Sequence, residues 1–170
     1  PGSTPGAATN VAMSALASTS AASVVRLGVS APGDSPSVLY TLSNAACSLN
    51  AGAGDGGSQV PTSDGKCWIA DMPSPAPITI WGAKGDCIGT FGTCNGGTPT
   101  DNSVSIQKAL NFVATNGGCL QVPLDTNRGA FYYASPLTLT LVSGQPTTPA
   151  QNVCIVGPGR LKPSTTLVGD

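Results

Sequence analysis

Turn-forming residues interrupt this chain so often that mainly short strands, and few helices, fit between them. Gly occurs 22 times and Pro 15 times in 170 residues, together more than a fifth of the chain, whereas ordinary usage of the two is roughly 12%. Aromatic residues make up 5% although 40% of residues are apolar, so a core must be built from Val, Ile, Leu and Ala. Such side chains suit narrow, regularly stacked β-layers. The sequence therefore predicts a mainly β protein with a thin core.

Charged residues are scarce and scattered. They make up 9% of the chain, and the net charge is −1. The basic residues form no stripe that could neutralise phosphates, so we expect no nucleic-acid binding; they are Arg26, Lys66, Lys84, Lys108, Arg128, Arg160 and Lys162. A surface of Ser, Thr, Asn, Gly and Ala is weakly hydrated and favours burial against other subunits. A plain soluble secreted domain is the alternative interpretation.

Neither a membrane span nor a secretory signal is predicted. Polar residues interrupt every apolar stretch before it reaches about 18 residues. The first charged residue is Arg26, so the N-terminus lacks the positive region with which a secretory signal begins. We expect any such signal to have been removed already. The start at Pro1 fits either loss of an initiator Met or earlier processing.

The six cysteines favour disulfides over a metal site. Their number is even, no C-x-x-C spacing occurs and the chain has no His, which removes most zinc-ligand sets. We therefore expect no metal and no cofactor. Cys87 and Cys94 lie close together in a Gly-rich loop and form the most local pair. Buried free thiols are the alternative, and disulfides would indicate an extracellular working life.

The first 75 residues divide into an arm and a small β-rich module. Residues 1–25 begin with a Pro- and Gly-rich tether and continue into an Ala-rich segment, so this N-terminal arm is predicted to be flexible or helical. Residues 26–75 form the β-rich module, with strands predicted at 24–29, 38–42 and 67–70 between turn signals. Three prolines in residues 72–77 mark the best domain boundary.

The remaining residues, 76–170, carry the strongest helix signal. Apolar residues at i, i+3, i+4 and i+7 predict a helix over 102–115; they are Ile106, Ala109, Leu110 and Val113. Thr100 or Asp101 is expected to cap it, and Gly117 to end it. Short apolar runs predict strands, which lie at 78–81, 120–122, 130–133, 137–141 and 153–156.

Several motifs occur in a recognisable order over about half of the chain. They are WGAKGD at 81–86, TDNSVSIQKAL at 100–110, NGGCLQVP at 116–123, SPLTL at 135–139 and NVCIVGPG at 152–159. This series resembles the first segment of the pectate-lyase-superfamily β-helix, as found in bacteriophage tailspike proteins and in some secreted polysaccharide-degrading enzymes. The series is specific for a fold and not for a reaction.

The resemblance implies the start of a right-handed parallel β-helix in residues 76–170. The 102–115 helix would cap the open first coil and cover its unpaired edge. Apolar residues on alternate positions of the strands would point inwards; these are Leu120, Val122, Leu137, Leu139, Val153 and Ile155. Cys119 would then face outwards and pair with Cys154 in the adjacent coil, and Cys47 would pair with Cys67. Because a solenoid needs about three repeats, we expect a fragment or the ordered part of a longer protein.

No catalytic constellation is assigned within the chain. Asp86 and Asp101 could form a carboxylate pair for glycoside hydrolysis, but a turn end and a helix cap are the stronger interpretation. Gly54–Gly57 has a weak likeness to a calcium turn, and a flexible loop is favoured. The aromatic residues that could stack on sugars are expected instead in the core or at subunit interfaces; they are Trp68, Trp81, Phe131, Tyr132 and Tyr133.

Together these features predict the structural N-terminal part of a phage tailspike or tail fibre. Residues 1–75 would attach the spike to phage tail or baseplate proteins, and residues 76–170 would nucleate a β-helix whose downstream coils recognise host polysaccharide. A homotrimer located in the virion tail is expected, and disulfides would close after release from a reducing cytoplasm. The alternative is a truncated secreted polysaccharide lyase or glycoside hydrolase, whose catalytic groups would lie in downstream coils.

Overall fold

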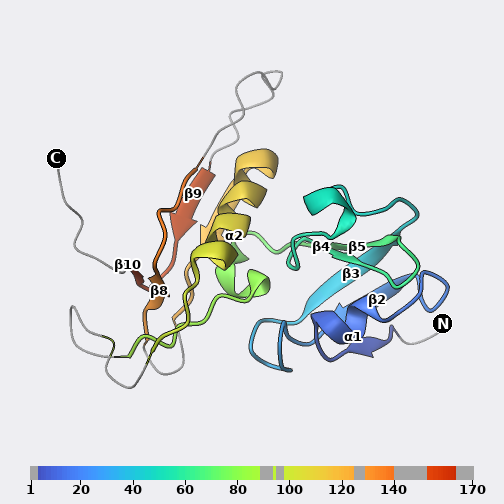
Figure 1. Cartoon of the computed structure of the whole chain (residues 1–170), viewed down its shortest axis with the longest axis horizontal. Helices are drawn as coiled ribbons and strands as arrows, with labels where there is room; N and C mark the ends of the chain where they lie inside the picture. The colour runs from blue at the N-terminus through green and yellow to red at the C-terminus, as the bar shows by residue number, and fades with distance from the viewer. Residues whose placement is uncertain (1–3, 89–93, 95–97, 125–128, 140–152, 164–170) are drawn as a thin grey trace. The chain divides into compact units, whose positions relative to one another are not determined.

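The computed structural model describes residues 4–88, 94, 98–124, 129–139 and 153–163. It divides into two compact units, which Figure 1 shows with their helices and strands. The first unit comprises Pro1–Pro73 and Thr79–Gly82, and the second comprises Ser74–Ile78 and Ala83–Asp170. The chain therefore enters the second unit, returns briefly to the first and then continues in the second. The predicted boundary at residue 75 lies near this division, whereas the one at residue 25 falls inside a strand.

The first unit is built on a five-stranded sheet in the order β1-β2-β3-β5-β4. Its strands are β1 (Gly6–Ala7), β2 (Ser23–Arg26), β3 (Val38–Ser43), β4 (Gln59–Pro61) and β5 (Cys67–Ala70). β1 runs parallel to β2, and the other neighbours are antiparallel. β2, β3 and β5 overlap the predicted strands, while β1 and β4 are additional.

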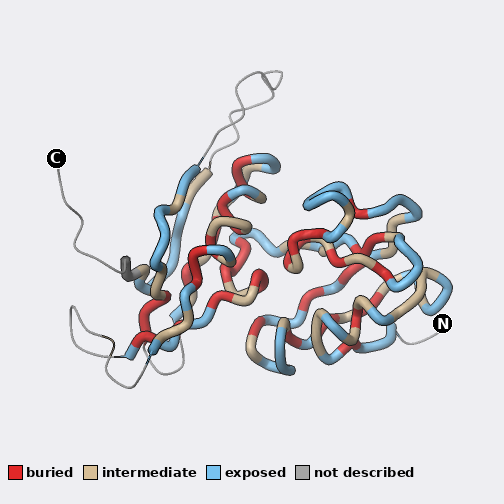
Figure 2. The backbone as a smooth tube through the Cα atoms, viewed as in Figure 1, coloured by how far each residue is buried: buried red, intermediate tan, exposed pale blue. Residues whose placement is uncertain are grey.

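One face of this sheet forms the core of the first unit. Period-2 alternation places the buried side chains of Val24, Tyr40, Val60 and Trp68 on that face. On the opposite face Leu39 and Ile69 are exposed. The alternation of buried and exposed positions along these strands can be followed in Figure 2. A short 3-10 helix, η1 (Asn50–Gly52), lies in the loop before β4.

The N-terminal segment is built into the first unit. The predicted helix is present in shortened form as α1 (Asn10–Ser14), and the Thr9 hydroxyl accepts a hydrogen bond from the Ala12 amide at 3.2 Å. The amide of Asn10 donates to the Val29 carbonyl at 3.0 Å. Ser18 contacts the turn between β4 and β5 through its amide, which donates to Asp64 at 3.0 Å. The described part of this segment therefore packs on its own chain, and of the two predicted states the helical one is present in shortened form.

The second unit contains two parallel sheets and the longer helix. One sheet has the order β6-β7-β9, and the other pairs β10 with β8. Its strands are β6 (Ala76–Pro77), β7 (Gly118–Gln121), β8 (Phe131–Tyr133), β9 (Val153–Val156) and β10 (Leu161–Pro163). Parallel pairing is what stacked coils require. The β-helix itself stays a prediction, and β10 is an additional strand.

Two strands predicted in this region are absent from the residues that the structure describes. Residues 78–81 form a 3-10 helix, η2 (Ile78–Trp81), instead of a strand. Both Ile78 and Ile80 are buried there, and side chains of the first unit bind its last turn, so tertiary contacts override β-propensity. Residues 137–139 have no strand assignment, and residues 140–141 of that predicted strand lie outside the described residues.

The helix prediction is confirmed as α2 (Ser103–Asn116). Its predicted apolar stripe, from Ile106 to Val113, is buried. Asp101 provides the N-terminal carboxylate, accepting from the Ser103 amide at 2.9 Å. Leu120 and Val122 are buried as expected, but Ile155 is 52% exposed and Leu139 is 43% exposed. The burial that an inward position implies is therefore absent for these two residues. Ile155 nevertheless lies opposite Leu120 in the β7–β9 register and so faces the same side of the sheet, as predicted.

Candidate functional site

A buried arginine lies at the centre of the first unit. Arg26, on β2, has no exposed surface. Its Nη1 donates to the Asn10 Oδ1 at 2.7 Å and to the Gly56 carbonyl at 2.9 Å, while its Nη2 donates to the Ile80 carbonyl at 2.9 Å. The guanidinium thereby joins α1, the 54–57 loop and η2. Its Nε has no hydrogen-bond partner in the described part of the chain.

Electrostatics around Arg26 favour a fixed internal role. Burial lowers the pKa of Arg26, and the nearby Tyr40, Asp34 and Asp55 oppose that shift. The guanidinium carbon lies 5.2 Å from the centre of the Tyr40 ring, a cation–π arrangement. Burial also raises the pKa of Tyr40, whose hydroxyl donates to the Gly57 carbonyl at 2.5 Å. A neutral tyrosine and a charged arginine therefore form one internal cluster.

The Gly54–Gly57 loop is ordered around Asp55. The carboxylate is buried and accepts from the Gly57 amide at 3.0 Å, the Gln59 amide at 2.8 Å and the Ser58 hydroxyl at 2.7 Å. The indole N–H of Trp81 donates to the same carboxylate at 2.8 Å. The prediction of a flexible loop is therefore wrong. These donors saturate the carboxylate oxygens that a calcium ion would need.

The two aspartates considered for catalysis hold the backbone of the second unit. Asp86 accepts from the Thr100 amide at 3.0 Å and from its hydroxyl at 2.5 Å. Asp101 accepts from the Ser103 hydroxyl at 2.5 Å and from the Ala134 amide at 3.0 Å. These hydrogen bonds lower the pKa of Asp101, and the bond from the Ser103 hydroxyl has the largest effect. A general acid for glycoside hydrolysis needs a raised pKa instead. The structure favours the turn and helix-cap roles.

Between those aspartates, Asn102 connects three segments of the second unit. It is buried, its Oδ1 accepts from the Lys84 amide at 2.7 Å, and its Nδ2 donates to the Lys84 carbonyl at 2.9 Å and the Tyr132 carbonyl at 3.0 Å. Neither Asn102 nor Arg26 was predicted from the sequence to have a central role. An arginine inside the apolar 24–29 strand was a usable signal for a buried cation; Asn102 had none beyond its place before the helix.

Three of the five aromatic residues considered for sugar stacking are internal. Trp68, Trp81 and Phe131 are buried, so their faces do not reach a ligand. Tyr132 and Tyr133 on β8 are half-buried. The predicted place in the core is therefore confirmed for Trp68, Trp81 and Phe131. Sugar stacking by the two tyrosines stays untested.

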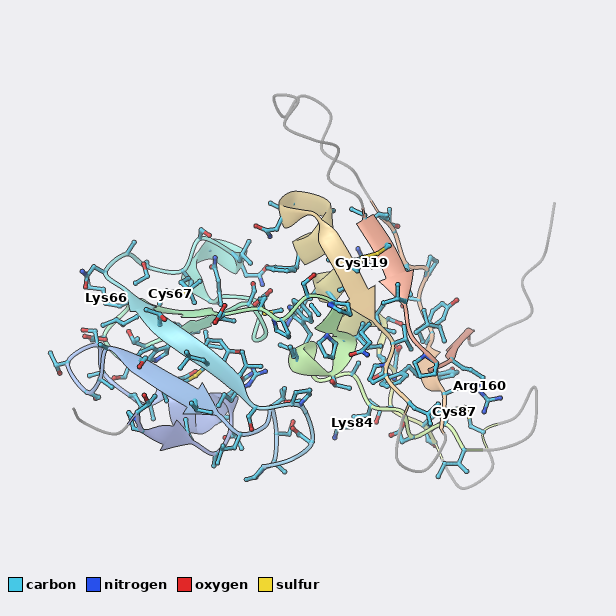
Figure 3. All side chains as sticks on the ribbon, turned by 180° about the vertical axis from the view of Figure 1, so that it is seen from behind. Lys66, Cys67, Lys84, Cys87, Cys119 and Arg160 are labelled. Carbon is cyan, nitrogen blue, oxygen red and sulfur yellow. A yellow bond between two sulfur atoms is a disulfide. The ribbon has the colours of Figure 1, made fainter. Side chains whose placement is uncertain are left out.

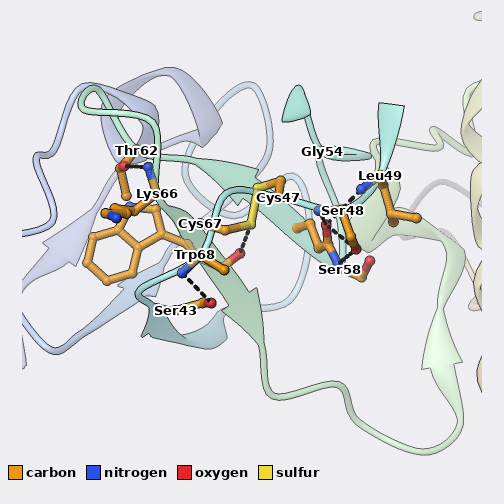
Figure 4. Close-up of a disulfide and its surroundings, with 12 residues drawn as sticks. Ser43, Cys47, Ser48, Leu49, Gly54, Ser58, Thr62, Lys66, Cys67 and Trp68 are labelled. Atoms are coloured by element: carbon orange, nitrogen blue, oxygen red, sulfur yellow. Dashed lines mark hydrogen bonds between the residues drawn. A yellow bond between two sulfur atoms is a disulfide. The ribbon is translucent and has the colours of Figure 1, made fainter. Parts of the chain in front are cut away.

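All three disulfide pairings expected from the sequence are present. They are Cys47–Cys67, Cys87–Cys94 and Cys119–Cys154, with Cα separations of 4.9, 4.8 and 4.5 Å. Figure 4 shows the first, which ties the segment after β3 to β5 next to Trp68. Cys119, labelled in Figure 3, lies directly opposite Cys154 on β7 and β9.

The described residues contain neither a metal-ligand cluster nor a membrane-spanning helix. They contain no group of three or more Cys, Asp or Glu side chains placed to hold a metal ion. Within the same residues, neither helix has the length and apolar character needed to cross a membrane.

Comparison with known proteins finds a likeness of fold. No protein-family model matches the chain, and no curated protein matches it. The enzymatically active domain of tailspike protein 4 of bacteriophage CBA120 matches with a TM-score of 0.58 and 14% identity, over 99% of this chain and 19% of that one. The tailspike protein of Acinetobacter baumannii phage AM24 matches with a TM-score of 0.55 and 18% identity, over 78% of this chain and 19% of that one.

These matches define the class of fold. The chain is a mainly β protein with few helices and is structurally similar to domains of phage tailspike proteins. It spans about a fifth of the length of those chains, 19% in both cases. The wider resemblance to the pectate-lyase superfamily stays a prediction from the sequence.

Proposed function

We propose that this chain is the N-terminal part of a phage tailspike, in which the first unit attaches the spike to the virion and the second begins a β-helix. The observation that carries the proposal is the match of 99% of the chain to a tailspike structure. The low charge supports it, because an uncharged surface suits burial against other tail subunits. The parallel pairs in the second unit support the start of stacked coils.

The attachment role is tested on assembled particles. Phage encoding a spike without residues 1–73 would be purified by density gradient and probed for the spike by immunoblot. We expect particles that lack the spike, while the released spike still binds host polysaccharide. A matched Leu39→Ala spike, altered at one exposed position of the same unit, should be retained on particles. Particles that keep the truncated spike would contradict the proposal.

The same proposal includes three further properties. They are a homotrimeric state, a location in the virion tail and recognition of host polysaccharide by downstream coils. Light scattering of the purified intact protein measures the subunit number, and a monomer at micromolar concentration would contradict the trimer. Release of oligosaccharides from host polysaccharide by the intact spike would show an enzyme. Spike found in culture fluid but never on particles would favour a secreted polysaccharide-degrading enzyme instead.

A further inference from the structure

The tryptophan of the WGAKGD motif belongs to the first unit, although the rest of the motif belongs to the second. Thr79–Gly82 is grouped with Pro1–Pro73, while Ala83 and the residues after it are grouped with the second unit. On one flank of this segment Ala76 pairs with Leu120 across β6 and β7. On the other flank Lys84 pairs with the Asn102 side chain. Residues 79–82, here called the strap, are therefore bracketed by residues that the second unit holds.

Three contacts fix the strap in the first unit. The Ile80 carbonyl accepts from Arg26 at 2.9 Å, and the Trp81 indole donates to Asp55 at 2.8 Å. Trp81 also packs closely against Gly57, because a Cβ built at Gly57 would lie 2.3 Å from the Trp81 Cδ1. Ile80 is 0% exposed and Trp81 is 4% exposed. The core of the first unit is thus completed by Ile80 and Trp81. These residues follow β6, which is the first strand of the second unit.

We infer that the strap couples the folding of the two units, so that the first unit is completed only when the chain has entered the second. The buried Arg26 and Asp55 each make one of their hydrogen bonds with the strap, and without it these buried charged groups would each lose a partner at an appreciable cost. In a tailspike, this would link the attachment unit to the coils. The inference rests on the proposed function only for that last statement.

Two spectroscopic probes separate the units in the full chain. The sequence contains two tryptophans, Trp68 and Trp81, and both are buried in the first unit. In a Trp81 variant the fluorescence of Trp68 therefore reports on the first unit. Circular dichroism at 222 nm reports chiefly on the second, because α2 has 14 residues and α1 has 5. Urea unfolding followed by both probes measures coupling directly.

For the unaltered chain we expect coincident transitions. Trp81→Ala should move the fluorescence midpoint to lower urea by about 1 M or more and separate it from the dichroism transition. Trp81→Phe keeps most of the ring and loses the Asp55 hydrogen bond, so it should move the midpoint less. Gly57→Ala, which displaces the indole without altering it, should act in the same direction. Leu39→Ala, at an exposed position, is the matched control and should move neither transition.

Three outcomes would overturn the inference. The first is separate transitions in the unaltered chain. The second is a Trp81→Ala variant in which both transitions fall together. The third is a variant in which only the dichroism transition falls, which would assign Trp81 to the second unit. If Trp81→Ala does not fold, Trp81→Phe with amide hydrogen exchange on β2 and β3 decides the matter, because faster exchange there is required. No virion is needed, so failure here would leave the attachment experiment unaffected.

Discussion

The side chain of Asn102 pairs with the backbone of Lys84 as a neighbouring β-strand would. The Lys84 amide donates to its Oδ1 at 2.7 Å, and its Nδ2 donates back to the Lys84 carbonyl at 2.9 Å. The same Nδ2 reaches the Tyr132 carbonyl at 3.0 Å. One buried amide thereby satisfies backbone groups of two segments, the one at Lys84 and the strand β8.

Replacing Asn102 with Ala should destabilise the second unit. The substitution removes the partner of the Lys84 amide and carbonyl at a part-buried place, so we expect the free energy of unfolding to fall by about 1–2 kcal/mol. Urea unfolding followed at 222 nm measures the change. Asn111→Ala, at an exposed position of α2, is the matched control and should cost less than about 0.5 kcal/mol. Equal losses in the two variants would show that the Asn102 pairing contributes nothing special.

Gly28 permits a close approach that no side chain allows. A Cβ at Gly28 would lie 1.8 Å from the Ala31 carbonyl oxygen, whereas one at Gly6 would meet nothing nearer than 4.0 Å. Gly28→Ala should therefore displace the 29–34 loop and lower the melting temperature by several degrees. Gly6→Ala should change it little. Differential scanning calorimetry of the two variants tests the pair, and a tolerated Gly28→Ala would contradict the loop geometry.

Acid should loosen the contact between Asp64 and the N-terminal segment. Hydrogen bonds from the Ser18 hydroxyl, then from the Thr62 hydroxyl, lower the pKa of Asp64 from 3.8 to about 2. The pKa of Asp64 is lower in the folded state than in the unfolded state. The stabilisation that the ionised Asp64 carboxylate provides is therefore complete above about pH 4 and is lost as the pH falls through about 2. Asp64→Asn should therefore be less stable than the unaltered chain at pH 6, and the difference should vanish near pH 2. Urea midpoints across that range measure it, and a difference independent of pH would refute the assignment.

The disulfide between β7 and β9 should stabilise more than the local one. Cys119–Cys154 closes a separation of 35 residues and Cys87–Cys94 one of 7, for which loop-closure entropy predicts roughly 4 and 2 kcal/mol. Replacing each pair with Ser in separate variants, and comparing unfolding by urea, measures the difference. A larger loss for the Cys87–Cys94 variant would indicate that native contacts, and not chain entropy, dominate.

The elements predicted correctly from the sequence are those whose conformation depends on residues close to one another in the chain. Residues 38–42 are a mainly apolar run that lies between turn signals, and they form β3; the i, i+3, i+4, i+7 stripe forms α2. The short strands β4 and β10 each end in a proline, Pro61 and Pro163, which weakens a strand signal. Residues 78–81 look like a strand because they are β-branched and aromatic. Their conformation instead follows from Arg26 and Asp55, which are distant in sequence.

The polar clusters were harder to predict because their partners come together only in the folded chain. Asp101 was predicted at the helix start and does bind the Ser103 amide, two positions away, although the N-cap residue itself is Asn102. Asp55 was assigned to a flexible loop because its Gly neighbours suggest mobility, yet Trp81 lies 26 positions further on. A burial pattern that depends on such a distant residue leaves no trace in a local window.

The carboxylates of Asp55, Asp64, Asp86 and Asp101 accept hydrogen bonds from amides, hydroxyls and an indole. Dissolved ions weaken attraction between opposite charges, but they have little effect on a carboxylate bonded to neutral donors. At these four places, the loops should therefore be held equally well in fresh water and in brine.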